Sequence, residues 1–312
     1  MISLFCTFAY MTLHDDIYDF LNGKGLYCRI TTLNGHPYLS CITCNGRTAS
    51  ILPIKIEAPG RSDAVTASDS ASQAIKNLTS LTGGYPLIIA EDRWRKQNDM
   101  MKARLLAHLE VFDQIYARNC EVRKIDRQTA ADFLTASHSY GDASCRHRYG
   151  LFLKRHTGHI VSERKESVRY PAGTLVAVAT FSNARKWTKG DKTIRSYEWT
   201  RYASLPGVRL SGGMGKLLKA FIEDVHPDDI MTYADLEWSE GKVYERLGFV
   251  LEGVKAPVTF SVDTVSWDRH AIKEQDMPSG HCPAIQSIMT NELVYFRNFG
   301  SNKYRFKLTD YQ

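Results

Sequence analysis

The chain has 312 residues, of which 43% are hydrophobic and 24% are charged, a composition typical of a soluble globular protein with a sizeable core. This length fits one large domain or two modest domains of roughly 150 residues each. No segment approaches the ~20 apolar residues that a membrane-spanning helix needs, so we expect no membrane partner and a cytoplasmic location. The apolar first residues lack a basic n-region and a small-residue cleavage pattern, and we interpret them as a buried element rather than a signal peptide.

The positive charge is concentrated in one segment. The net charge is +6, yet Cys145–Arg201 alone carries 13 Lys and Arg against four Asp and Glu, so the rest of the chain is slightly negative. Such a block predicts a polyanionic partner. The alternative is a solvated basic face with no partner.

The first half predicts a small unit followed by helices. Residues 1 to about 56 alternate short apolar runs with Asn-Gly turn signals, which favours a β-rich or α+β unit. A Ser- and Ala-rich stretch follows, either a solvated connection or the start of a weak helix around Gln73–Leu81. The next expected elements are a strand at "YPLIIAEDRW", a helix from Arg95 to about Tyr116, a strand at "CEVRKID" and a helix near Asp126–His138.

The second half alternates strands and helices more clearly, and it contains no internal repeat. Two antiparallel strands, "YGLFLKR" and "TLVAVATFS", are expected to flank a basic hairpin loop. After them we expect a strand at "RSYEWTRYAS", a glycine turn, a helix over Gly213–Val225, a strand at "DIMTYADLEW", a helix at "GKVYERLGF", a strand at "FVLEG" and a closing hairpin in "LVYFRNFGSNKYRFKL".

The glycine turn is a candidate anion site. A helix N-terminus presents unpaired N–H groups and a partial positive charge, and glycines let a phosphate approach the backbone closely. Gly212, Gly213 and Gly215 supply that approach, and Lys216 adds charge. The alternative is that these glycines only build a tight helix start with close helix–sheet packing.

The order of elements, with "VYERLGFVLEG" and "RYASLPGVRLSGGMGKLLKAF", resembles the acyl-CoA N-acyltransferase (GNAT) superfamily over roughly residues 120–308. The resemblance implies an α+β fold, with a mixed, mostly antiparallel sheet flanked by helices and preceded by a small α/β N-terminal region. It implies acetyl-CoA or a related acyl-CoA as cofactor, held by Arg209, Gly212, Gly213, Gly215 and Lys216. The superfamily usually has Arg/Gln-x-x-Gly-x-Gly/Ala, and a motif that starts at Arg209 places Met214 where Gly or Ala is expected.

A closer resemblance within that superfamily rests on "CEVRKID…FLTASHSYG", "LVAVATFS", "YEWTRYAS", "GGMGKLLKAF" and "YADLEWSEGKVYERLGF". These segments look like a domain of phage and mobile-element proteins, similar to the Mom-type DNA-modification proteins, that often follows an endonuclease of the very-short-patch-repair type. From Tyr85 the chain looks like the tail of that nuclease. We therefore expect a small N-terminal region or nuclease remnant at 1–84, a strand–helix connector at 85–119, and a GNAT-like domain at 120–312.

The sequence gives weak signals for a metal site, and we expect none. A metal-dependent nuclease needs converging carboxylates, usually with a nearby Lys or His. Before Tyr85, Lys55 precedes Glu57, the reverse of the Glu-x-Lys order, so we expect the nuclease core to be absent or degenerate. The other acidic candidates there are Asp15, Asp16, Asp19, Asp63 and Asp69.

The cysteines offer one alternative to this expectation. "CITC", with Cys41 and Cys44, has the spacing of half a zinc site, and Cys28 and His36 would complete a set. Against this, no second pair follows at finger spacing. The odd total of seven cysteines in an intracellular-looking chain predicts free thiols.

Candidate catalytic residues flank the gap that the resemblance implies between two splayed central strands. Arg201 and Asp235 lie near the ends of those strands, and Tyr244 lies on the next helix, at a general-acid position. His138 matches a histidine turn of the phage-type domain, and it would act as a base, a base reader or a ligand. The alternatives are a structural Arg201–Asp235 ion pair and a helix-end histidine.

Strand alternation helps to choose between Arg201 and Glu198, which occupies a general-base-like position. Alternation places Arg201 on the face of Tyr197 and Trp199, opposite Glu198. Both side chains face one cleft only if a bulge intervenes. We favour Arg201 because Asp235 offers a matching charge.

Candidate nucleic-acid contacts come from the basic block and one loop. They are Arg185, Lys186, Lys189, Arg195 and Trp238. The cations would follow a DNA backbone, and Trp238 would stack on an extruded base. The alternative for Trp238 is a packed loop tryptophan.

Three functions compete. The leading hypothesis is a phage-type, acyltransferase-like enzyme that acts on DNA and modifies a base by group transfer. The second is a non-catalytic DNA-binding accessory derived from an endonuclease fusion. The third is an N-acyltransferase that acts on a protein or a small-molecule amine.

Overall fold

The computed structural model describes residues 12–159, 168–272 and 293–311. The chain divides into two compact units: unit 1 is Met1–Lys96 with Thr259–Arg297, and unit 2 is Gln97–Val258 with Asn298–Gln312. In the described part of the chain, every helix is too short or too polar to cross a membrane. Most of the apolar stretch at the start of the chain lies outside the described residues, and its last residues begin a helix at Leu13, whose side chain is buried.

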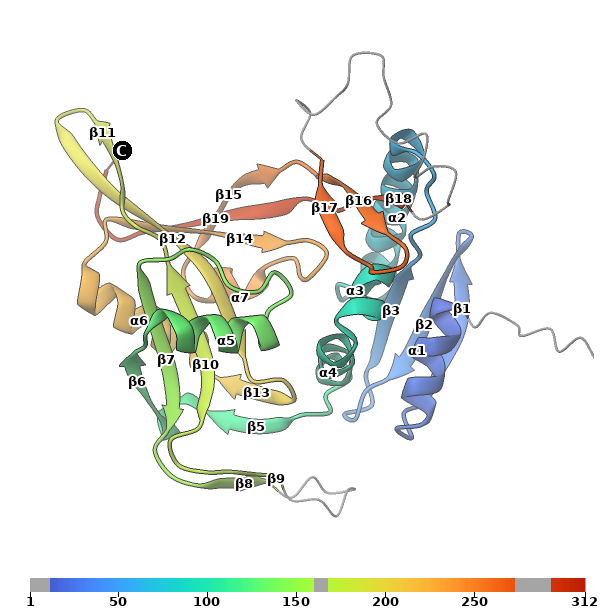
Figure 1. The fold of residues 1–312 in the computed structure, drawn as a ribbon, viewed down its shortest axis with the longest axis horizontal. Helices are drawn as coiled ribbons and strands as arrows, with labels where there is room; N and C mark the ends of the chain where they lie inside the picture. The colour runs from blue at the N-terminus through green and yellow to red at the C-terminus, as the bar shows by residue number, and fades with distance from the viewer. Residues whose placement is uncertain (1–11, 160–167, 273–292, 312) are drawn as a thin grey trace, which may run out of the picture. The chain divides into compact units, whose positions relative to one another are not determined.

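Unit 1 is built on a four-stranded sheet in the order β1-β2-β3-β4 (Figure 1). The elements are α1 (Leu13–Asn22), β1 (Cys28–Leu33), β2 (His36–Ile42), β3 (Thr48–Ile54), α2 (Arg61–Thr82), β4 (Leu87–Ala90) and α3 (Glu91–Lys96). The first three strands are antiparallel neighbours, and α2 returns the chain so that β4 runs parallel to β3. The weak helix expected around Gln73–Leu81 is the second half of α2, which has 22 residues.

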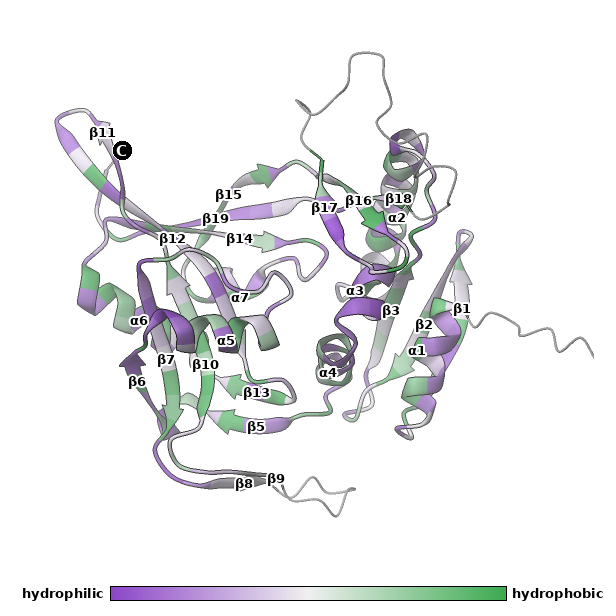
Figure 2. Ribbon diagram, in the orientation of Figure 1, coloured by the Kyte–Doolittle hydropathy of each residue, from purple (hydrophilic) through white to green (hydrophobic). Residues whose placement is uncertain are grey.

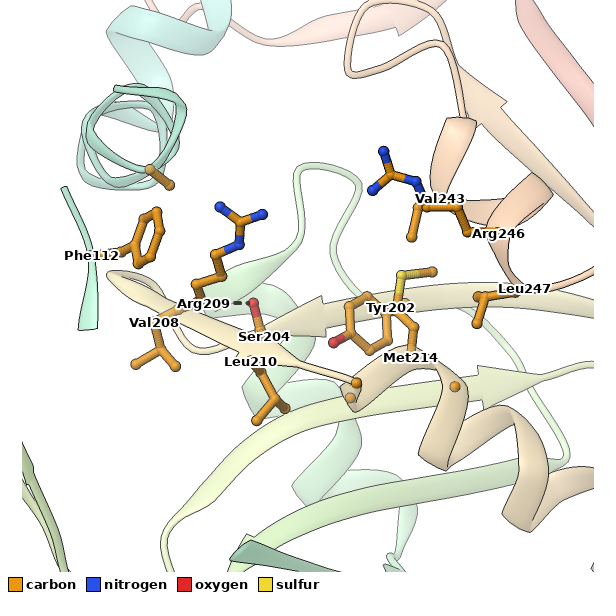
Figure 3. A pocket seen from close by; sticks show the side chains of 14 residues that line it. Phe112, Tyr202, Ser204, Val208, Arg209, Leu210, Met214, Val243, Arg246 and Leu247 are labelled. Carbon is orange, nitrogen blue, oxygen red and sulfur yellow. Dashed lines mark hydrogen bonds between the residues drawn. The ribbon is translucent and has the colours of Figure 1, made fainter. Parts of the chain in front are cut away.

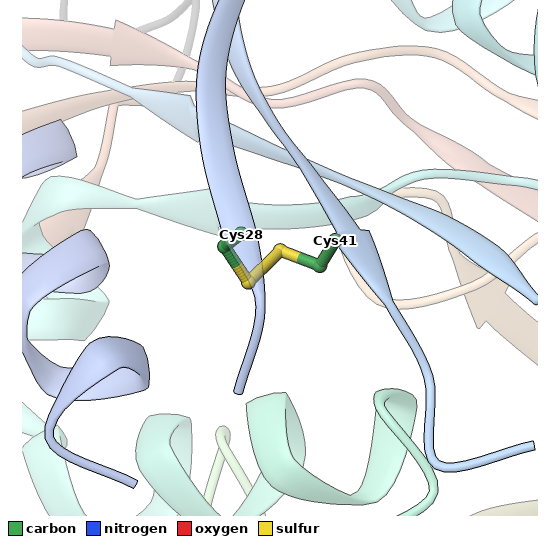
Figure 4. The surroundings of a disulfide bond; sticks show 2 residues. All are labelled: Cys28 and Cys41. Atoms are coloured by element: carbon green, nitrogen blue, oxygen red, sulfur yellow. A yellow bond between two sulfur atoms is a disulfide. The ribbon is translucent and has the colours of Figure 1, made fainter. Parts of the chain in front are cut away.

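Cys28 and Cys41 lie opposite each other on β1 and β2 and form a disulfide (Figure 4). The expectation of free thiols is therefore wrong for this pair. Cys44, Cys120 and Cys145 are free, and the other two cysteines lie outside the described residues. The pairing depends on the register of the hairpin, which cysteine spacing does not reveal.

A three-stranded sheet in the order β17-β16-β18 completes unit 1. Its strands are β16 (Thr259–Asp263), β17 (Arg269–Ala271) and β18 (Leu293–Arg297), and both β16 and β18 contact α2. Arg269 on β17 forms a bidentate ion pair with Asp92 on α3, with N–O distances of 2.5 and 2.6 Å. Both side chains are buried, so this late segment is fastened to the N-terminal elements.

Unit 2 is built on a mixed sheet in the order β15-β19-β14-β12-β10-β7-β6, with β11 paired to the start of β12. The strands are β6 (Cys120–Lys124), β7 (His147–Leu153), β10 (Leu175–Phe181), β11 (Arg185–Lys189), β12 (Lys192–Ser204), β14 (Asp229–Asp235), β15 (Val250–Lys255) and β19 (Ser301–Lys307). All neighbours are antiparallel except β12 and β14. The predicted fold class is confirmed: α+β, with a mixed, mostly antiparallel sheet flanked by helices.

Two helices cover opposite faces of this sheet, namely α5 (Arg127–Ser137) and α6 (Gly213–Val225). Under α6, Phe221 stacks on Phe181 with 3.8 Å between ring centroids, inside an aromatic core. Under α5, Leu134 joins a smaller cluster with Val178. Strand β10 supplies residues to both cores, which is why it is almost wholly buried and hydrophobic along its length (Figure 2).

The prediction of a single helix from Arg95 to Tyr116 is wrong. The chain instead forms α3, then α4 (Asn98–His108), and then strand β5 (Asp113–Tyr116). Between α4 and β5, Glu110 has a positive φ of 67°. Strand β5 pairs in parallel with β13 (Val208–Ser211), a partner so distant in sequence that helical periodicity cannot reveal it.

The closing hairpin expected near the C-terminus is also wrong. Strand β18 pairs with β16 in unit 1, whereas β19 pairs with β14 and β15 in unit 2. The compact units also group residues differently from the three-part division expected from the sequence. They place Thr259–Arg297 with the N-terminal elements, and they place Gln97 and the residues after it in unit 2.

Candidate functional site

The central strands of unit 2 separate part-way along their length. β12 and β14 pair over only three residues each, ending at Glu198 and Met231. Beyond that point β12 stays paired to β10, and β14 stays paired to β19. A gap therefore opens between them. At its start, Thr232 Oγ1 donates to the Trp199 carbonyl at 3.0 Å.

β12 carries a β-bulge where this gap opens. Trp199 lies opposite Phe181 and Arg201 lies opposite Thr180, so Thr200 is the extra residue. Trp199 Nε1 donates to the Arg201 carbonyl at 3.0 Å, which satisfies a backbone acceptor at the bulge. The bulge moves every later residue of β12 to the opposite face.

The bulge corrects the predicted placement of Arg201. Tyr197 and Trp199 belong to the core under α6, and Tyr202 packs against the same core. Ala203 packs under α5, and Arg201, two residues before it on the strand, shares that face. Unbroken alternation predicted that Arg201 faces the same side as Tyr197 and Trp199. The bulge instead places Arg201 on the opposite side.

The glycine turn begins α6 where the sequence predicted a helix start. Gly212 is the N-cap residue, with φ 77° and ψ 5°, a left-handed conformation that glycine adopts without strain. Gly213 is the first helical residue, where a Cβ would lie 2.6 Å from Leu210 Cδ2 and 2.9 Å from Tyr202 Oη. One glycine is thus required by backbone conformation and the other by close packing.

A cavity of about 490 Å³ opens beside this turn (Figure 3). Its lining includes two arginines, Arg209 and Arg246, and no carboxylate. Figure 3 shows these two side chains on opposite sides of the cavity. The larger apolar side chains of the lining are Phe112, Val208, Leu210, Met214, Val243 and Leu247. Unbalanced positive charge beside a helix N-terminus favours an anionic ligand.

Not every predicted cofactor residue faces this cavity. Gly212, Gly213, Gly215 and Arg209 line it. Lys216 instead donates through Nζ to the carbonyls of Ala117, at 2.9 Å, and Cys120, at 2.6 Å. Its ammonium anchors α6 to the start of β6, and Arg246 on α7 (Lys242–Arg246) supplies the second cation of the cavity.

Two tyrosines near the cavity hold their protons. Burial raises the pKa of the Tyr202 hydroxyl, and the neighbouring Tyr244 raises it further. Burial also raises the pKa of Tyr244, partly offset by a hydrogen bond with Thr232. Both rings pack edge-on against Trp199, with centroids about 6 Å away. Only Tyr202 lines the cavity.

Arg201 and Asp235 do not form the ion pair that was considered as an alternative. Arg201 donates to two backbone carbonyls, those of Gly141 at 3.2 Å and Thr200 at 2.9 Å. Asp235, at the end of β14, accepts from Tyr140 Oη at 2.6 Å. The Arg201 guanidinium lies 6.0 Å from the centre of the Tyr140 ring, so Tyr140 neighbours both charged groups.

His138 is the C-cap residue of α5. Its Nδ1 accepts from the Tyr140 backbone N–H at 3.1 Å, and its carbonyl accepts from the Gly141 N–H at 2.8 Å. His138 thus shapes the turn that presents Tyr140 to Asp235. This arrangement agrees with the alternative of a helix-end histidine. It also places His138 beside Tyr140, which contacts Asp235.

The predicted nucleic-acid contacts fall in different environments. Arg185, Lys186 and Lys189 lie on β11, where every residue is exposed. Arg195, opposite Lys186 on β12, donates to the His226 carbonyl and is held by Asp228. Residues 160–167, which carry part of the basic block, lie outside the described residues.

Trp238 lies in the loop after β14. The Arg104 guanidinium stacks on its ring, with 3.9 Å from Cζ to the ring centre, and donates to its carbonyl at 2.6 Å. The indole is 37% exposed, so its second face remains partly open. Arg104 therefore occupies one of the two faces that a stacked base would use.

Unit 1 holds the residues considered for metal chemistry. Within the described ranges, no three His, Cys, Asp or Glu side chains gather into a group that could hold a metal. The disulfide removes Cys28 and Cys41 from the zinc alternative, because a metal ligand must be a free thiolate. Glu57 pairs with Lys55, at 2.6 Å.

Sequence reasoning missed four residues that the structure brings into these sites: Tyr202, Arg246, Phe112 and Tyr140. Arg246 lies within "YERLGF", and Tyr140 lies beside His138 in "SHSYG". Both residues therefore belong to sequence segments that carry the resemblance, and these segments could have identified them. Tyr202 needed the bulge to be known, and Phe112 needed the β5–β13 pairing.

Comparison of the sequence with models of protein families gives no match, and comparison with curated proteins gives none either. Among solved structures, one match is a chain of the NatC complex bound to Gag peptide and CoA, with a TM-score of 0.31 and 11% identity over 61% of this chain and 99% of that one. A GNAT-family acetyltransferase from Bacillus anthracis has a TM-score of 0.29 and 13% identity over 61% and 95%. A probable N-acyltransferase from Enterococcus faecalis has a TM-score of 0.30 and 12% identity over 48% and 36%. Similarities this low do not show what this chain binds.

Proposed function

We propose that unit 2 is an acyltransferase that uses an acyl-CoA donor and an amine acceptor. The observation that carries the proposal is a single cavity where three features meet: the glycine turn, two arginines with no carboxylate among the lining residues, and the ends of the separating strands. β12 contributes Tyr202 and Ser204 to its lining, and α7, which follows β14, contributes Val243 and Arg246. A turn that only shaped the backbone would not require a cationic cavity beside it.

The lining fits the phosphate groups of such a donor. The N–H groups at the start of α6 point out of the helix, and no side chain at Gly213 covers them. Arg209 and Arg246 would each pair with phosphate oxygens, for which guanidinium groups are well shaped. When bound, acyl-CoA supplies an acyl group already activated as a thioester.

The residues around the gap would assist the proton transfers that accompany acyl transfer. The acceptor nitrogen must lose a proton as the C–N bond forms, and the departing sulfur must gain one as the C–S bond breaks. Tyr202 lines the cavity and is protonated at neutral pH, so its hydroxyl can donate a hydrogen bond to the departing sulfur, which takes its proton from the attacking nitrogen. Asp235, hydrogen-bonded to Tyr140, can hold or deprotonate a cationic amine.

Calorimetric titration with acetyl-CoA tests this proposal. We expect saturable binding at low micromolar affinity, weakened roughly tenfold by Arg209→Ala or Arg246→Ala, since a hydrogen bond to a charged group contributes about 1.5–3 kcal/mol. Lys219→Ala is the matched control, because Lys219 is an exposed cation on α6. Absence of heat from folded wild-type protein would overturn the proposal.

Nucleic-acid binding is a second candidate function, favoured by the two-stranded ribbon β11–β12. In this ribbon Lys186 lies opposite Arg195, and Lys189 lies opposite Lys192. Like charges in direct cross-strand pairs are unfavourable, and although Asp228 partners Arg195, the exposed cations of β11 would be stabilised by an external anion. The resemblance to phage-type DNA-modification domains makes DNA the polyanion we propose, and a β-ribbon has the width to enter its major groove.

Binding of a short DNA duplex, measured by fluorescence anisotropy between 50 and 200 mM salt, tests this second candidate. Replacing Arg185, Lys186 and Lys189 together by Ala should weaken binding and reduce the logarithmic salt slope by about 3, since each phosphate contact contributes roughly 0.9. The control removes the same charge elsewhere, at the exposed Lys24, Lys76 and Lys219. Absent or salt-independent binding would contradict it. DNA binding without acetyl-CoA binding would favour the non-catalytic accessory.

A further inference from the structure

Phe112 forms one wall of the cavity, beside Arg209. The Arg209 guanidinium carbon lies 5.1 Å from the centre of the Phe112 ring. Figure 3 shows the ring on the side of the cavity away from Arg246 and α7. Phe112 is half-buried and belongs to the lining, so an aromatic ring and a guanidinium group meet at the cavity surface.

This wall is rigidly built, and it comes from the segment that precedes the main sheet. Phe112 directly precedes β5, which pairs with β13, the strand that carries Arg209. The Asp113 N–H donates to the Gly207 carbonyl at 2.8 Å, and Gln114 Nε2 donates to the Arg209 carbonyl at 2.9 Å. The segment expected to be a simple connector is thus fixed in register against the glycine turn.

We propose that Phe112 and Arg209 form the nucleobase subsite of the cavity, and that its ligand is an adenine nucleotide bearing phosphate groups. The inference rests on the proposed function for the identity of the donor, and it adds which wall takes the base. Aromatic rings and guanidinium planes both stack on nucleobases. The phosphates then lie between Arg209 and Arg246, over the N-terminus of α6.

The arrangement of the lining supports this orientation over the reverse one. Phe112 is the aromatic residue at the edge of the cavity remote from α7, whereas Val243 lies on α7, Leu247 is its C-cap residue, and Met214 lies on the same side of the cavity as these two (Figure 3). The pairing of β12 with β14 ends at Glu198 and Met231, and Tyr202, farther along the unpaired part of β12, lines the cavity. A donor bound with its base on Phe112 therefore directs its thioester arm along the apolar side chains toward the gap.

Calorimetry on the full chain with three probes tests the subsite: CoA, adenosine 3′,5′-bisphosphate and 4′-phosphopantetheine. We expect Phe112→Leu to weaken CoA and the bisphosphate roughly tenfold, since stacking contributes about 1–3 kcal/mol per base, and to leave 4′-phosphopantetheine unchanged. Phe112→Trp should retain or improve binding of both nucleotides. The matched control is Tyr116→Leu, because Tyr116 lies on β5 under the Arg118 guanidinium, at 4.6 Å, outside the cavity lining.

The outcomes separate this inference from the proposed function. If wild-type protein binds CoA but Phe112→Leu binds the bisphosphate as tightly as wild type does, the subsite is wrong and the acyl-CoA proposal stands. If wild type binds the bisphosphate in a Phe112-dependent way but not CoA, the subsite stands and the acyl-CoA proposal falls. A loss of affinity shared by all three probes would indicate a general folding defect, and equal binding of the bisphosphate by Phe112→Trp and Phe112→Leu would then overturn the subsite.

Discussion

Different interactions stabilise the paired and the separated ends of β12 and β14. At the paired end, Asp229 is fully buried and accepts from Arg305 Nη1, at 2.6 Å, and from the hydroxyls of Ser196 and Tyr311. Arg305 also binds both carboxylate oxygens of Glu252. This ionic network ties β12, β14, β15 and β19 together.

At the separated end, backbone groups are satisfied locally. The Trp199 carbonyl accepts from Thr232, and the Arg201 carbonyl accepts from the Trp199 indole. Here side chains replace the hydrogen bonds that a continuing ladder would have made. The two ends therefore differ in how they are stabilised: an ionic network joins the strands at the paired end, whereas side chains satisfy the backbone at the separated end, and the part of β12 beyond the pairing lines the cavity.

Breaking the paired end should have the largest effect. We expect Asp229→Ala to lower the free energy of unfolding by about 3–5 kcal/mol, because it removes the fully buried carboxylate that Arg305, Ser196 and Tyr311 share and leaves Arg305 with Glu252 alone. Urea denaturation measures this. The control is Lys303→Ala, which removes the more exposed contact of Lys303 with Glu252 and should cost about 1 kcal/mol or less. Equal losses in the two variants would contradict this role of the ionic network.

Crowding the separated end should have an intermediate effect. A Cβ at Gly213 would come within 3 Å of both Leu210 and Tyr202, so Gly213→Ala should cost about 1–3 kcal/mol of stability and weaken acetyl-CoA binding. The same change at Gly215 places the Cβ 3.3 Å from the flexible end of Leu247, and it gains helix propensity. Thermal unfolding and calorimetry on both variants would show whether only Gly213 is sensitive.

Acid should weaken the paired end slightly. Hydrogen bonds from Arg305 lower the pKa of Glu252 from 4.5 to about 2. Because the folded pKa lies below the unfolded one, this stabilisation is complete above about pH 4.5 and is lost as the pH falls toward 2. Glu252 is 38% exposed, so we expect about 1 kcal/mol or less. The stability gap between wild type and Glu252→Gln should narrow between pH 6 and pH 2.5, whereas Glu223→Gln, at an exposed position of α6, should show no such narrowing.

Local sequence patterns were enough to predict much of unit 2. The helix Gly213–Val225, the antiparallel strands β7 and β10 and the α+β class follow from periodicity and turn residues, which act over a few positions. The glycine turn was also visible, because a left-handed N-cap such as Gly212 and a position as crowded as Gly213 both demand glycine.

Only the tertiary structure decided the features that depend on register or on distant partners. A one-residue bulge at Thr200 places Arg201 on the α5 face of the sheet and Tyr202 on the α6 face. No local sequence pattern in β12 predicts this bulge. The wall at Phe112 exists because β5 pairs with β13, and the Cys28–Cys41 bond exists because one hairpin has one register. Segment Thr259–Arg297 rejoins the N-terminal unit through Arg269 and Asp92. The sequence by itself determined which elements form, because propensity is local, whereas pairing across the chain determined which side chains meet.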